Sequence, residues 1–379
     1  MKKVLIFSFA YFPMVGGAEV AVKEITDRIS GFQFDMVTRN FGTQKFEKIG
    51  NINVYRVKGP KLFFPFIAFC KAVRLNKKNK YDATWSIMAN RAGFAALFFK
   101  FFNPKIPFLL TLQEGDEPDY PQRRMGIFYF FLKPFFRKIF TRADKIQVIS
   151  SYLADWAKKM GAKNVEVIPN GVDVEKFRKS SFQKSLNPIR FANGAPPPTI
   201  FENDFCYIIT VSRLVKKNAV SDIIEALRFL PENVKLLIVG DGPEKEKLEL
   251  QVISYKFQDR VKFIGELSQN ELPKYLATAD IFVRPSLSEG LGNAFLEAMA
   301  AGLPVIGTKV GGIPDFLHDN ETGLFCEVNN PQSIAEKVKL YLENDDLRGK
   351  IITNAQKLVL EKYDWNQISA KMEKILNSL

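Results

Sequence analysis

Short apolar runs alternate with longer amphipathic segments along the chain. In the first half, the runs that we expect to form buried strands are Lys3–Ser8, Phe34–Thr38, Asn53–Val57, Ala83–Ser86, Phe108–Thr111, Lys145–Ile149 and Val165–Ile168. Segments with helical periodicity, such as Ala18–Ile29 and Tyr152–Met160, lie between several of them. Buried strands that alternate with helices are typical of parallel sheets covered by helices on both faces.

The second half repeats this alternation. Its strand-like runs are Tyr207–Val211, Lys235–Val239, Val261–Ile264, Ile281–Arg284, Pro304–Gly307 and Leu324–Cys326. Residues 171–204, between the two halves, are rich in Ser, Asn, Pro and Gly and show no periodicity, which indicates a linker or an irregular insertion. The pattern therefore predicts two doubly wound α/β domains that face each other across a cleft, with ligands at the carboxyl ends of the strands.

The composition agrees with a two-domain globular protein. The chain has 379 residues, of which 46% are hydrophobic and 25% charged. No apolar run approaches the roughly 18 residues of a spanning helix, and we interpret Lys3–Ser8 as a buried first strand rather than part of a signal peptide. Cys70, Cys206 and Cys326 fit no metal or redox spacing, which favours a reducing, cytoplasmic setting.

The charge is distributed unevenly between the two halves. Residues 1–190 contain 33 Lys and Arg against 15 Asp and Glu, whereas the remainder contains 21 against 26, and the net charge is +13. A basic first half predicts an anionic partner. Nucleic acid, an acidic glycan and a phospholipid surface all satisfy this expectation.

Phenylalanines accompany the basic residues in segments 61–80, 97–105 and 122–145. In the last segment, an apolar stripe at near-helical spacing consists of Phe128, Phe131, Phe135 and Ile139. Aromatic and basic residues on an amphipathic helix suit a membrane interface, although the same phenylalanines could belong to the core of the first domain. The absence of a known reader motif argues against nucleic acid.

Candidate chemistry is concentrated in SEGLGNAFLEAMAAG, residues 288–302. The turn after the strand Ile281–Arg284 leads into a helix that begins near Asn293, and glycines there allow a ligand to approach the backbone. A helix N-terminus favours phosphate. The predicted diphosphate-binding residues are Gly290, Leu291, Gly292 and Asn293.

Two glutamates flank this turn. Of Glu289 and Glu297, one can hold a sugar hydroxyl while the other holds ribose hydroxyls further along the ligand. Alternatively, Glu289 is a solvated loop residue and Glu297 satisfies nearby backbone donors. A glycosidase pair fits less well, because its two carboxylates would flank one bond with no phosphate site beside them.

Cationic residues follow the strand Tyr207–Val211. Arg213 and Lys217 are placed to neutralise a diphosphate, with Lys216 as the competing lysine, although all three could be solvated surface charges. Gly240 follows the next strand and is a further donor-binding candidate. The Gly240-Asp241-Gly242 stretch is not a full dinucleotide-binding fingerprint.

These motifs, taken together, resemble the retaining glycosyltransferases of family 4, which have the GT-B fold of two Rossmann-like domains. The matching stretches are YFPMVGGAE (11–19), VIPNGVD (167–173), SRLVKKN (212–218), VGDGPE (239–244), PSLSEGLGNAFLEAMAAGLPV (285–305), GGIPDFL (311–317) and TGLF (322–325). The resemblance implies an acceptor-binding domain over 1–190 and a donor-binding domain over 191–362. It also implies a last helix, 363–379, that crosses back to the first domain.

The resemblance also implies residue roles. Glu289 would contact the transferred sugar, Glu297 the ribose, and Arg213 with Lys217 the diphosphate. Gly16 and Gly17 would let the loop of the first domain approach the reaction centre.

The sequence departs from the family pattern in two places. Gln113 stands where many members have a histidine, and the only histidine, His318, lies in the second domain, so Gln113 can only hydrogen-bond the sugar or orient the acceptor. The lysine of SRLVKKN comes one place early, with Asn218 at the commoner position. Whether Lys216 or Lys217 holds the diphosphate is therefore open.

The sequence thus predicts a retaining transferase that moves a hexose or hexosamine from a nucleotide-diphosphate sugar, UDP- or GDP-linked, to a glycan or lipid-linked acceptor. We expect no cofactor and no metal, because no Asp-x-Asp element follows a strand. The setting would be cytoplasmic, with peripheral docking on the inner face of a membrane left open, in polysaccharide or lipopolysaccharide biosynthesis. A GT-B nucleotide-sugar epimerase and a non-catalytic protein that binds sugar nucleotides or anionic lipids are the alternatives.

Overall fold

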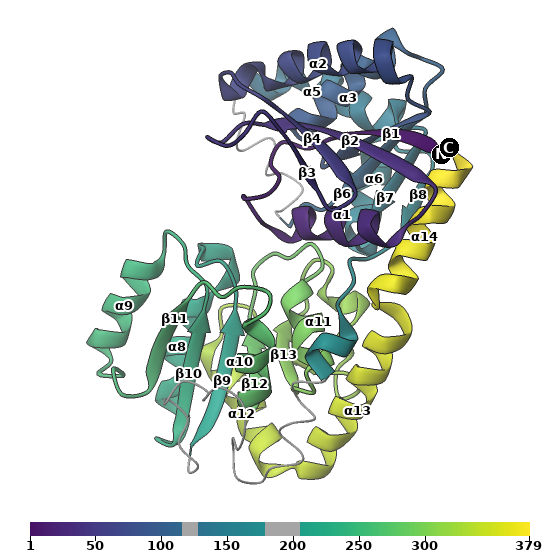
Figure 1. The fold of residues 1–379 in the computed structure, drawn as a ribbon. Helices are drawn as coiled ribbons and strands as arrows, with labels where there is room; N and C mark the ends of the chain where they lie inside the picture. Colours follow the sequence, from purple (N-terminus) through teal and green to yellow (C-terminus); the bar gives the residue numbers. More distant parts are fainter. Residues whose placement is uncertain (116–127, 179–204) are drawn as a thin grey trace. The chain divides into compact units, whose positions relative to one another are not determined.

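The computed structural model describes residues 1–115, 128–178 and 205–379 (Figure 1). Its contacts divide the chain into two compact units. Unit 1 comprises Met1–Asn170 together with Trp365–Leu379, and unit 2 comprises Gly171–Asp364. The domain boundary expected at 190/191 lies outside the described residues.

Unit 1 is built on an eight-stranded sheet with the order β3-β4-β2-β1-β5-β6-β7-β8. Its strands are β1 (Lys2–Phe7), β2 (Phe32–Arg39), β3 (Phe46–Ile49), β4 (Ile52–Val57), β5 (Ala83–Ile87), β6 (Phe108–Leu112), β7 (Lys145–Val148) and β8 (Val165–Val167). All neighbours pair in parallel except β3 and β4, which are antiparallel. The pattern analysis missed β3, because this edge strand buries none of its residues and so has no apolar run.

Helices cover both faces of this sheet. They are α1 (Gly17–Arg28), η1 (Lys61–Phe63), α2 (Phe64–Asn79), α3 (Arg91–Phe102), α5 (Phe128–Arg142), α6 (Ser151–Lys159) and α14 (Trp365–Ser378). Helices α2, α3 and α5 lie on one face, and α1 and α14 lie on the other (Figure 1). Crossover connections explain this arrangement, because a helix between two parallel strands returns the chain to the end of the sheet at which the next strand begins.

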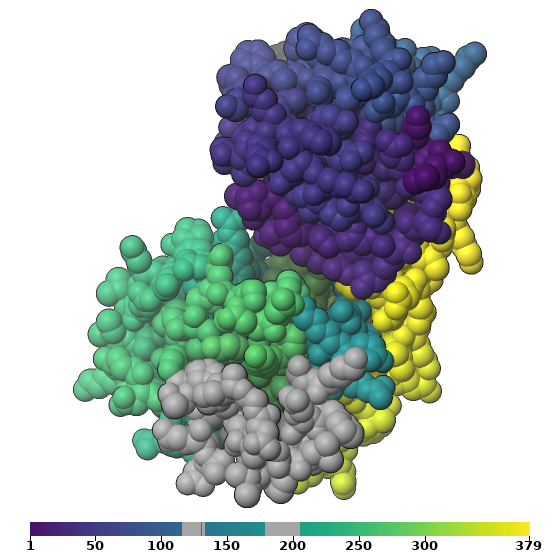
Figure 2. Space-filling view, in the orientation of Figure 1, coloured from purple at the N-terminus to yellow at the C-terminus, as the bar shows by residue number. Residues whose placement is uncertain are grey.

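The last helix belongs to the core of unit 1 although it lies at the end of the chain. Trp365, Ile368 and Met372 of α14 are buried in one cluster with Val22 and Ile25 of α1. In the space-filling view, α14 in yellow lies beside the purple N-terminal residues (Figure 2). The periodic apolar face of α14 is therefore explained by its contact with α1.

The apolar stripe predicted for 122–145 does not form a single face of α5. Phe135 is exposed, whereas Ile139 is fully buried. The buried face of α5 instead combines Ile139 with Phe136 and Phe140, whose rings contact Trp156 of α6. The side chains of Phe128 and Phe131 lie outside the described part of the chain.

Unit 2 contains a six-stranded parallel sheet with the order β11-β10-β9-β12-β13-β14. The strands are β9 (Cys206–Val211), β10 (Val234–Val239), β11 (Val261–Gly265), β12 (Ile281–Arg284), β13 (Val305–Thr308) and β14 (Leu324–Cys326). The helices are η2 (Lys216–Asn218), α8 (Val220–Ala226), η3 (Leu227–Phe229), α9 (Lys245–Ser254), α10 (Leu272–Thr278), α11 (Asn293–Ala300), η4 (Ile313–Asp315), α12 (Pro331–Glu343) and α13 (Asp345–Lys362). The two predicted parallel-sheet α/β units are confirmed.

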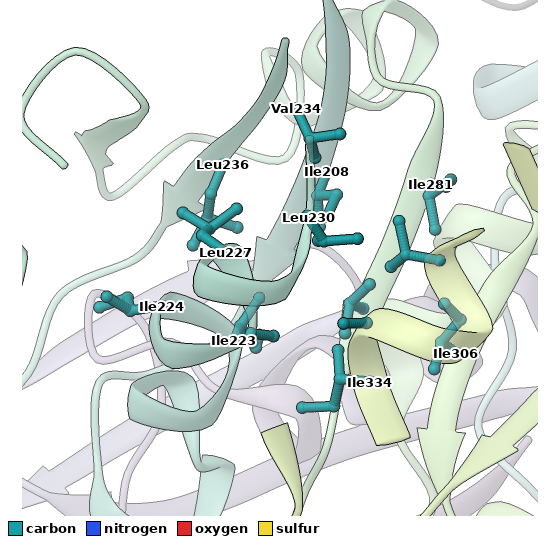
Figure 3. Packing of buried hydrophobic residues seen from close by; sticks show 14 of the residues in the cluster. Ile208, Ile223, Ile224, Leu227, Leu230, Val234, Leu236, Ile281, Ile306 and Ile334 are labelled. Atoms are coloured by element: carbon teal, nitrogen blue, oxygen red, sulfur yellow. The ribbon is translucent and has the colours of Figure 1, made fainter. Parts of the chain in front are cut away.

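The core of unit 2 lies between the sheet and the helices on its face. Ile208 of β9 and Leu236 of β10 are fully buried in one cluster with Ile223 of α8 and Leu227 of η3, and Ile334 of α12 joins them (Figure 3). Side chains at this density fix the strand ends, so the loops beyond those ends start from rigid positions.

We expect Met372→Ala to lower the free energy of unfolding of unit 1 by about 2–5 kcal/mol, because it leaves a cavity between α14 and α1. All three tryptophans, Trp85, Trp156 and Trp365, belong to unit 1, so their fluorescence in a urea titration reports this unit alone. The exposed neighbour provides the control, and Lys371→Ala should change stability by less than about 0.5 kcal/mol. Equal effects of the two substitutions would contradict the packing of α14.

Candidate functional site

The candidate site lies at the carboxyl ends of β9 and β12, which are neighbours in the sheet of unit 2. From β9 the strand order runs to β10 on one side and to β12 on the other, so the chain reverses direction across the sheet here. The loops beyond the two strands are joined by a hydrogen bond of 2.7 Å from the Leu287 amide to the Lys217 carbonyl. The structure therefore brings the stretches SRLVKKN and SEGLGN together at a topological switch point.

Glycines bring the end of β10 against the loop that follows β9. Gly240 has φ +123°, and a Cβ atom there would lie 2.0 Å from the Ser212 carbonyl oxygen. The Leu214 amide donates to the Asp241 carbonyl at 2.9 Å. Gly240 thus has a packing role, and its predicted contact with a donor stays a prediction.

An open recess of about 440 Å³ lies beside these strand ends. Its lining residues are Arg213, Asp241, Gly242 and Glu266. The Arg213 side chain is exposed, so its guanidinium can reach a ligand in this recess.

Glu289 is held by both its backbone and its side chain. Its carboxylate Oε1 accepts a hydrogen bond of 3.0 Å from the Gly290 amide, and its carbonyl accepts one of 3.1 Å from the Gly312 amide. Gly311 has φ +54°, and a Cβ there would lie 1.9 Å from the Glu289 carbonyl oxygen. Gly311 and Gly312 therefore support Glu289, a contribution that the sequence indicated only as part of a family motif.

Sequence reasoning passed over Arg284, the last residue of β12. Its Nη2 lies 2.5 Å from Oε2 of Glu289, and both side chains are largely buried. The same Nη2 donates to Asn218 Oδ1 at 3.1 Å, and Asn218 Nδ2 donates to the Arg213 carbonyl at 2.6 Å. The sequence did contain a signal for this residue: Arg284 is a cation at the end of a predicted strand, five residues before the candidate carboxylate Glu289.

The two lysines of SRLVKKN differ in exposure. Lys216 is exposed, whereas Lys217 is half-buried. Asn218 is buried, and both ends of its side-chain amide are hydrogen-bonded. Neither observation decides which lysine would meet a diphosphate.

The helix α11 starts at the predicted glycine turn. Gly292 precedes it with φ +100°, Asn293 is its first residue, and Leu291 is buried. Glu297 is its only charged residue and is partly exposed. Desolvation raises the pKa of Glu297 to about 7, opposed by a hydrogen bond from Gln269 and by the charges of Lys176 and Arg284.

Several buried polar atoms around the strand ends take no hydrogen bond within the described ranges. They are Thr210 Oγ1, Ser212 Oγ, Arg284 Nε, Ser286 Oγ and Glu289 Oε2, the last of which is in ion-pair contact with Arg284 Nη2. Buried polar groups are paired in the great majority of cases. In the described part of unit 2, these are all such atoms except Asp222 Oδ2, and their position at the ends of β9 and β12 favours a polar ligand there.

The remaining predicted residues belong to unit 1. Gly16 and Gly17 are exposed at the start of α1, where the carboxylate of Glu19 lies close to Gly16, and burial raises the pKa of Glu19. Gln113 follows β6 and accepts a hydrogen bond of 3.0 Å from Asn170 Nδ2. In the parts that the structure describes, no group of His, Cys, Asp or Glu could hold a metal, and no helix is long and apolar enough to cross a membrane.

Comparison with known families matches almost the whole chain. Residues 15–176 match the model described as glycosyltransferase family 4, and residues 197–358 match the model described as glycosyl transferases group 1. The chain is a family 4 glycosyltransferase. The predicted family and enzyme class are thereby confirmed, and the alternatives of an epimerase and a non-catalytic binding protein are set aside.

Individual relatives agree with this assignment. An uncharacterized glycosyltransferase of Methanocaldococcus jannaschii is 26% identical, over 100% of this chain and 99% of its own. The GDP-mannose-dependent alpha-(1-6)-phosphatidylinositol monomannoside mannosyltransferase of Mycobacterium tuberculosis is 30% identical over 63% of both chains. The structure of Anabaena HepE in complex with UDP-glucose superimposes with a TM-score of 0.81, at 20% identity and with full coverage of both chains. This glycosyltransferase therefore has the predicted GT-B fold.

The raised pKa of Glu297 makes the stability of unit 2 depend on pH. Between about pH 5 and 7 the folded protein keeps the Glu297 proton that the unfolded chain releases, so the free energy of unfolding falls as the pH rises. Glu297→Gln stays neutral. From pH 5 to 8 we therefore expect the stability of the wild type to fall relative to this variant by about 2–3 kcal/mol.

Urea titrations followed by far-ultraviolet circular dichroism measure this effect, because circular dichroism reports the unfolding of both units. Tryptophan fluorescence reports unit 1 alone, so an unfolding transition that is seen only by circular dichroism belongs to unit 2. Glu249→Gln, at an exposed position of α9, is the matched control and should show no such trend. If the free energy of unfolding depends on pH in the same way for the wild type and for Glu297→Gln, the raised pKa of Glu297 is wrong.

Proposed function

We propose that this glycosyltransferase moves a hexose or hexosamine, with retention of configuration and without a metal, from a nucleotide-diphosphate sugar to a glycan or lipid-linked acceptor. The observation that carries the proposal is the ion pair of Arg284 with Glu289 beside the ends of β9 and β12, next to buried polar atoms that take no hydrogen bond in the described chain. A diphosphate and a sugar supply, respectively, the negative charge and the hydroxyls that such a site requires.

The main electrostatic task of the reaction is to stabilise the leaving diphosphate. When the bond between the sugar C1 and the phosphate oxygen breaks, the electron pair stays on that oxygen. Arg213 and Lys217, with the backbone amides of Gly290, Leu291, Gly292 and Asn293 at the start of α11, would take up this charge. Fixed donors of this kind do not need to reorganise during the reaction.

The carboxylates and Gln113 would position the reactants. Glu289 would accept hydrogen bonds from the transferred sugar, Glu297 would bind the ribose, and Gln113 would orient the acceptor. The acceptor oxygen forms the new bond to C1, and its proton passes to the leaving phosphate oxygen, which keeps the charge balanced. Gly16 and Gly17 would be donor-binding residues, because glycines let the loop of unit 1 come close to a ligand.

The nucleotide of the donor is the first point to test. One relative is named as GDP-mannose-dependent, and one similar structure holds UDP-glucose, so both bases belong in the panel. A donor at 100 times its Kd should stabilise the protein by about 2.7 kcal/mol. We expect one of UDP-glucose, UDP-N-acetylglucosamine, GDP-mannose, ADP-glucose and dTDP-glucose to raise the melting temperature and to release its nucleoside diphosphate. A panel without stabilisation or turnover would refute the proposal.

Arg213→Ala should lower kcat about 100-fold with a saturating donor, because the lost donor acts on charge that develops in the transition state. Steady-state release of the nucleoside diphosphate measures the effect. Arg228→Ala removes an exposed arginine of unit 2 whose ion pair is with Glu225, and it should leave kcat unchanged. An unchanged kcat for Arg213→Ala would exclude this role for Arg213.

We further infer that the face of unit 1 formed by α2, α3 and α5 meets an anionic membrane surface. Helices α2, α3 and α5 together contain ten Lys and Arg and no Asp or Glu. Their side-chain charges are therefore all of one sign, complementary to acidic phospholipids. The M. tuberculosis relative is named for a phosphatidylinositol-linked acceptor, which supports a lipid-linked substrate class.

Exposed phenylalanines accompany these cations on the same three helices and on η1, the turn that precedes α2. The aromatic residues that project from the surface are Phe63, Phe66, Phe101, Phe102, Phe130 and Phe135. Phe69 connects two of them, with its ring centroid 6.4 Å from Phe66 and 5.1 Å from Phe102. Lys138 lies 6.0 Å from the Phe101 ring and 5.3 Å from the Phe135 ring. Adjacent aromatic and cationic groups suit the boundary between lipid headgroups and acyl chains.

The double substitution Phe66→Ser, Phe102→Ser should weaken binding to vesicles of phosphatidylglycerol and phosphatidylcholine by about 10-fold or more, because each phenylalanine buries apolar area in the bilayer. Vesicle flotation measures the bound fraction. Phe229→Ser, at an exposed position in unit 2, should bind as the wild type does. Pure phosphatidylcholine or 0.5 M salt should reduce binding of all variants. A wild type that ignores anionic vesicles would refute this docking.

A further inference from the structure

Arg284 and Glu289 form a largely buried pair at the end of β12. Their side chains are 12% and 13% exposed, and the distance from Nη2 to Oε2 is 2.5 Å. Breaking such a pair would leave a buried charge uncompensated, so the two groups stay together when a ligand arrives.

A third residue holds the guanidinium in place. Asn218 Oδ1 accepts from Arg284 Nη2 at 3.1 Å, and the amide of Asn218 is itself anchored to the Arg213 carbonyl. Asn218 is neutral and occupies the position where the family pattern commonly has a lysine. A fixed positive charge at this point of the site therefore comes from Arg284, at the end of β12.

Two atoms of the pair can still bind a ligand. Arg284 Nε, a donor, is buried and takes no hydrogen bond from the residues that the structure describes. Glu289 Oε2 is in contact with Arg284 Nη2, and its second lone pair can accept a further hydrogen bond. A ligand group that satisfies both must accept one hydrogen bond and donate another. A hydroxyl does both, whereas an ionised phosphate oxygen only accepts.

We propose that Arg284 and Glu289 together bind one hydroxyl of the transferred sugar, with Arg284 Nε donating to the hydroxyl oxygen and the hydroxyl donating to Glu289 Oε2. Arg284 is thereby a specificity-determining residue of the donor site. This assignment rests on the nucleotide-sugar donor proposed above. A sugar that lacks this hydroxyl leaves the buried Nε donor unpaired and the Oε2 acceptor without its second partner, which is the strongest basis for rejecting a close analogue.

Single-deoxy analogues of the best donor from the panel test this assignment directly. We expect the wild type to lose about 100-fold or more in kcat/KM for one analogue and much less for the others. Arg284→Gln should lower kcat/KM for the parent donor at least about 10-fold and leave that analogue nearly unchanged, so that discrimination between the two largely disappears. Arg284→Lys keeps the charge without Nε, and it should retain more parent activity than the Gln variant while still discriminating poorly.

Arg260→Gln is the matched control. Arg260 is a partly buried arginine of unit 2 that donates to the carbonyls of Leu227, Pro231 and Val234, at the amino ends of β10 and β11 and so at the end of the sheet opposite the site. Its loss should lower stability and leave the discrimination intact. If Arg284→Gln does not fold, the Lys variant and the analogue series on the wild type still decide the matter.

The outcomes separate this inference from the function on which it rests. A wild type that turns over the parent donor but tolerates every single-deoxy analogue would overturn the hydroxyl site alone. The hydroxyl site would also be overturned if Arg284→Gln and Arg284→Lys still discriminate between the parent donor and the deoxy analogue as the wild type does. A wild type that uses no nucleotide sugar at all would overturn both proposals.

Discussion

The pairing of β9 with β12 is the constraint on which the candidate site depends. It makes neighbours of two loops that are about seventy residues apart in the sequence, and the hydrogen bond from Leu287 to Lys217 joins them. Because both strands are buried and packed against helices, their ends are rigid. The cationic loop and the carboxylate loop can then act on one ligand with little loss of conformational entropy on binding.

Charge at this junction is arranged as a connected set. Arg284 contacts Glu289 and Asn218, and Asn218 anchors the backbone of Arg213. Gly311 permits the close approach that fixes the Glu289 backbone. Polar atoms without hydrogen bonds in the described chain remain at the same place, as expected for a site whose last partners belong to the substrate.

Unit 1 divides its aromatic residues between two tasks. On α5, Phe136 and Phe140 pack against Trp156, while Phe135 stays at the surface with Lys138. Composition alone cannot separate these tasks, since both kinds of phenylalanine occur in one basic segment. The exposed set occupies helices without a single carboxylate, and this one-sided charge connects it to an anionic surface.

The sequence by itself determined the strands, the domain type and the glycine turn, because burial periodicity and turn chemistry are local properties. Ile281–Arg284 and Leu324–Cys326 were predicted with the bounds that the structure has, while the short polar edge strand β3 left no apolar signal. Only the tertiary structure decided that Arg284 meets Glu289, that Gly311 supports it, and which phenylalanines are exposed. These facts depend on strand order and helix rotation, which are set by packing between residues far apart in the chain and leave no pattern in either segment alone.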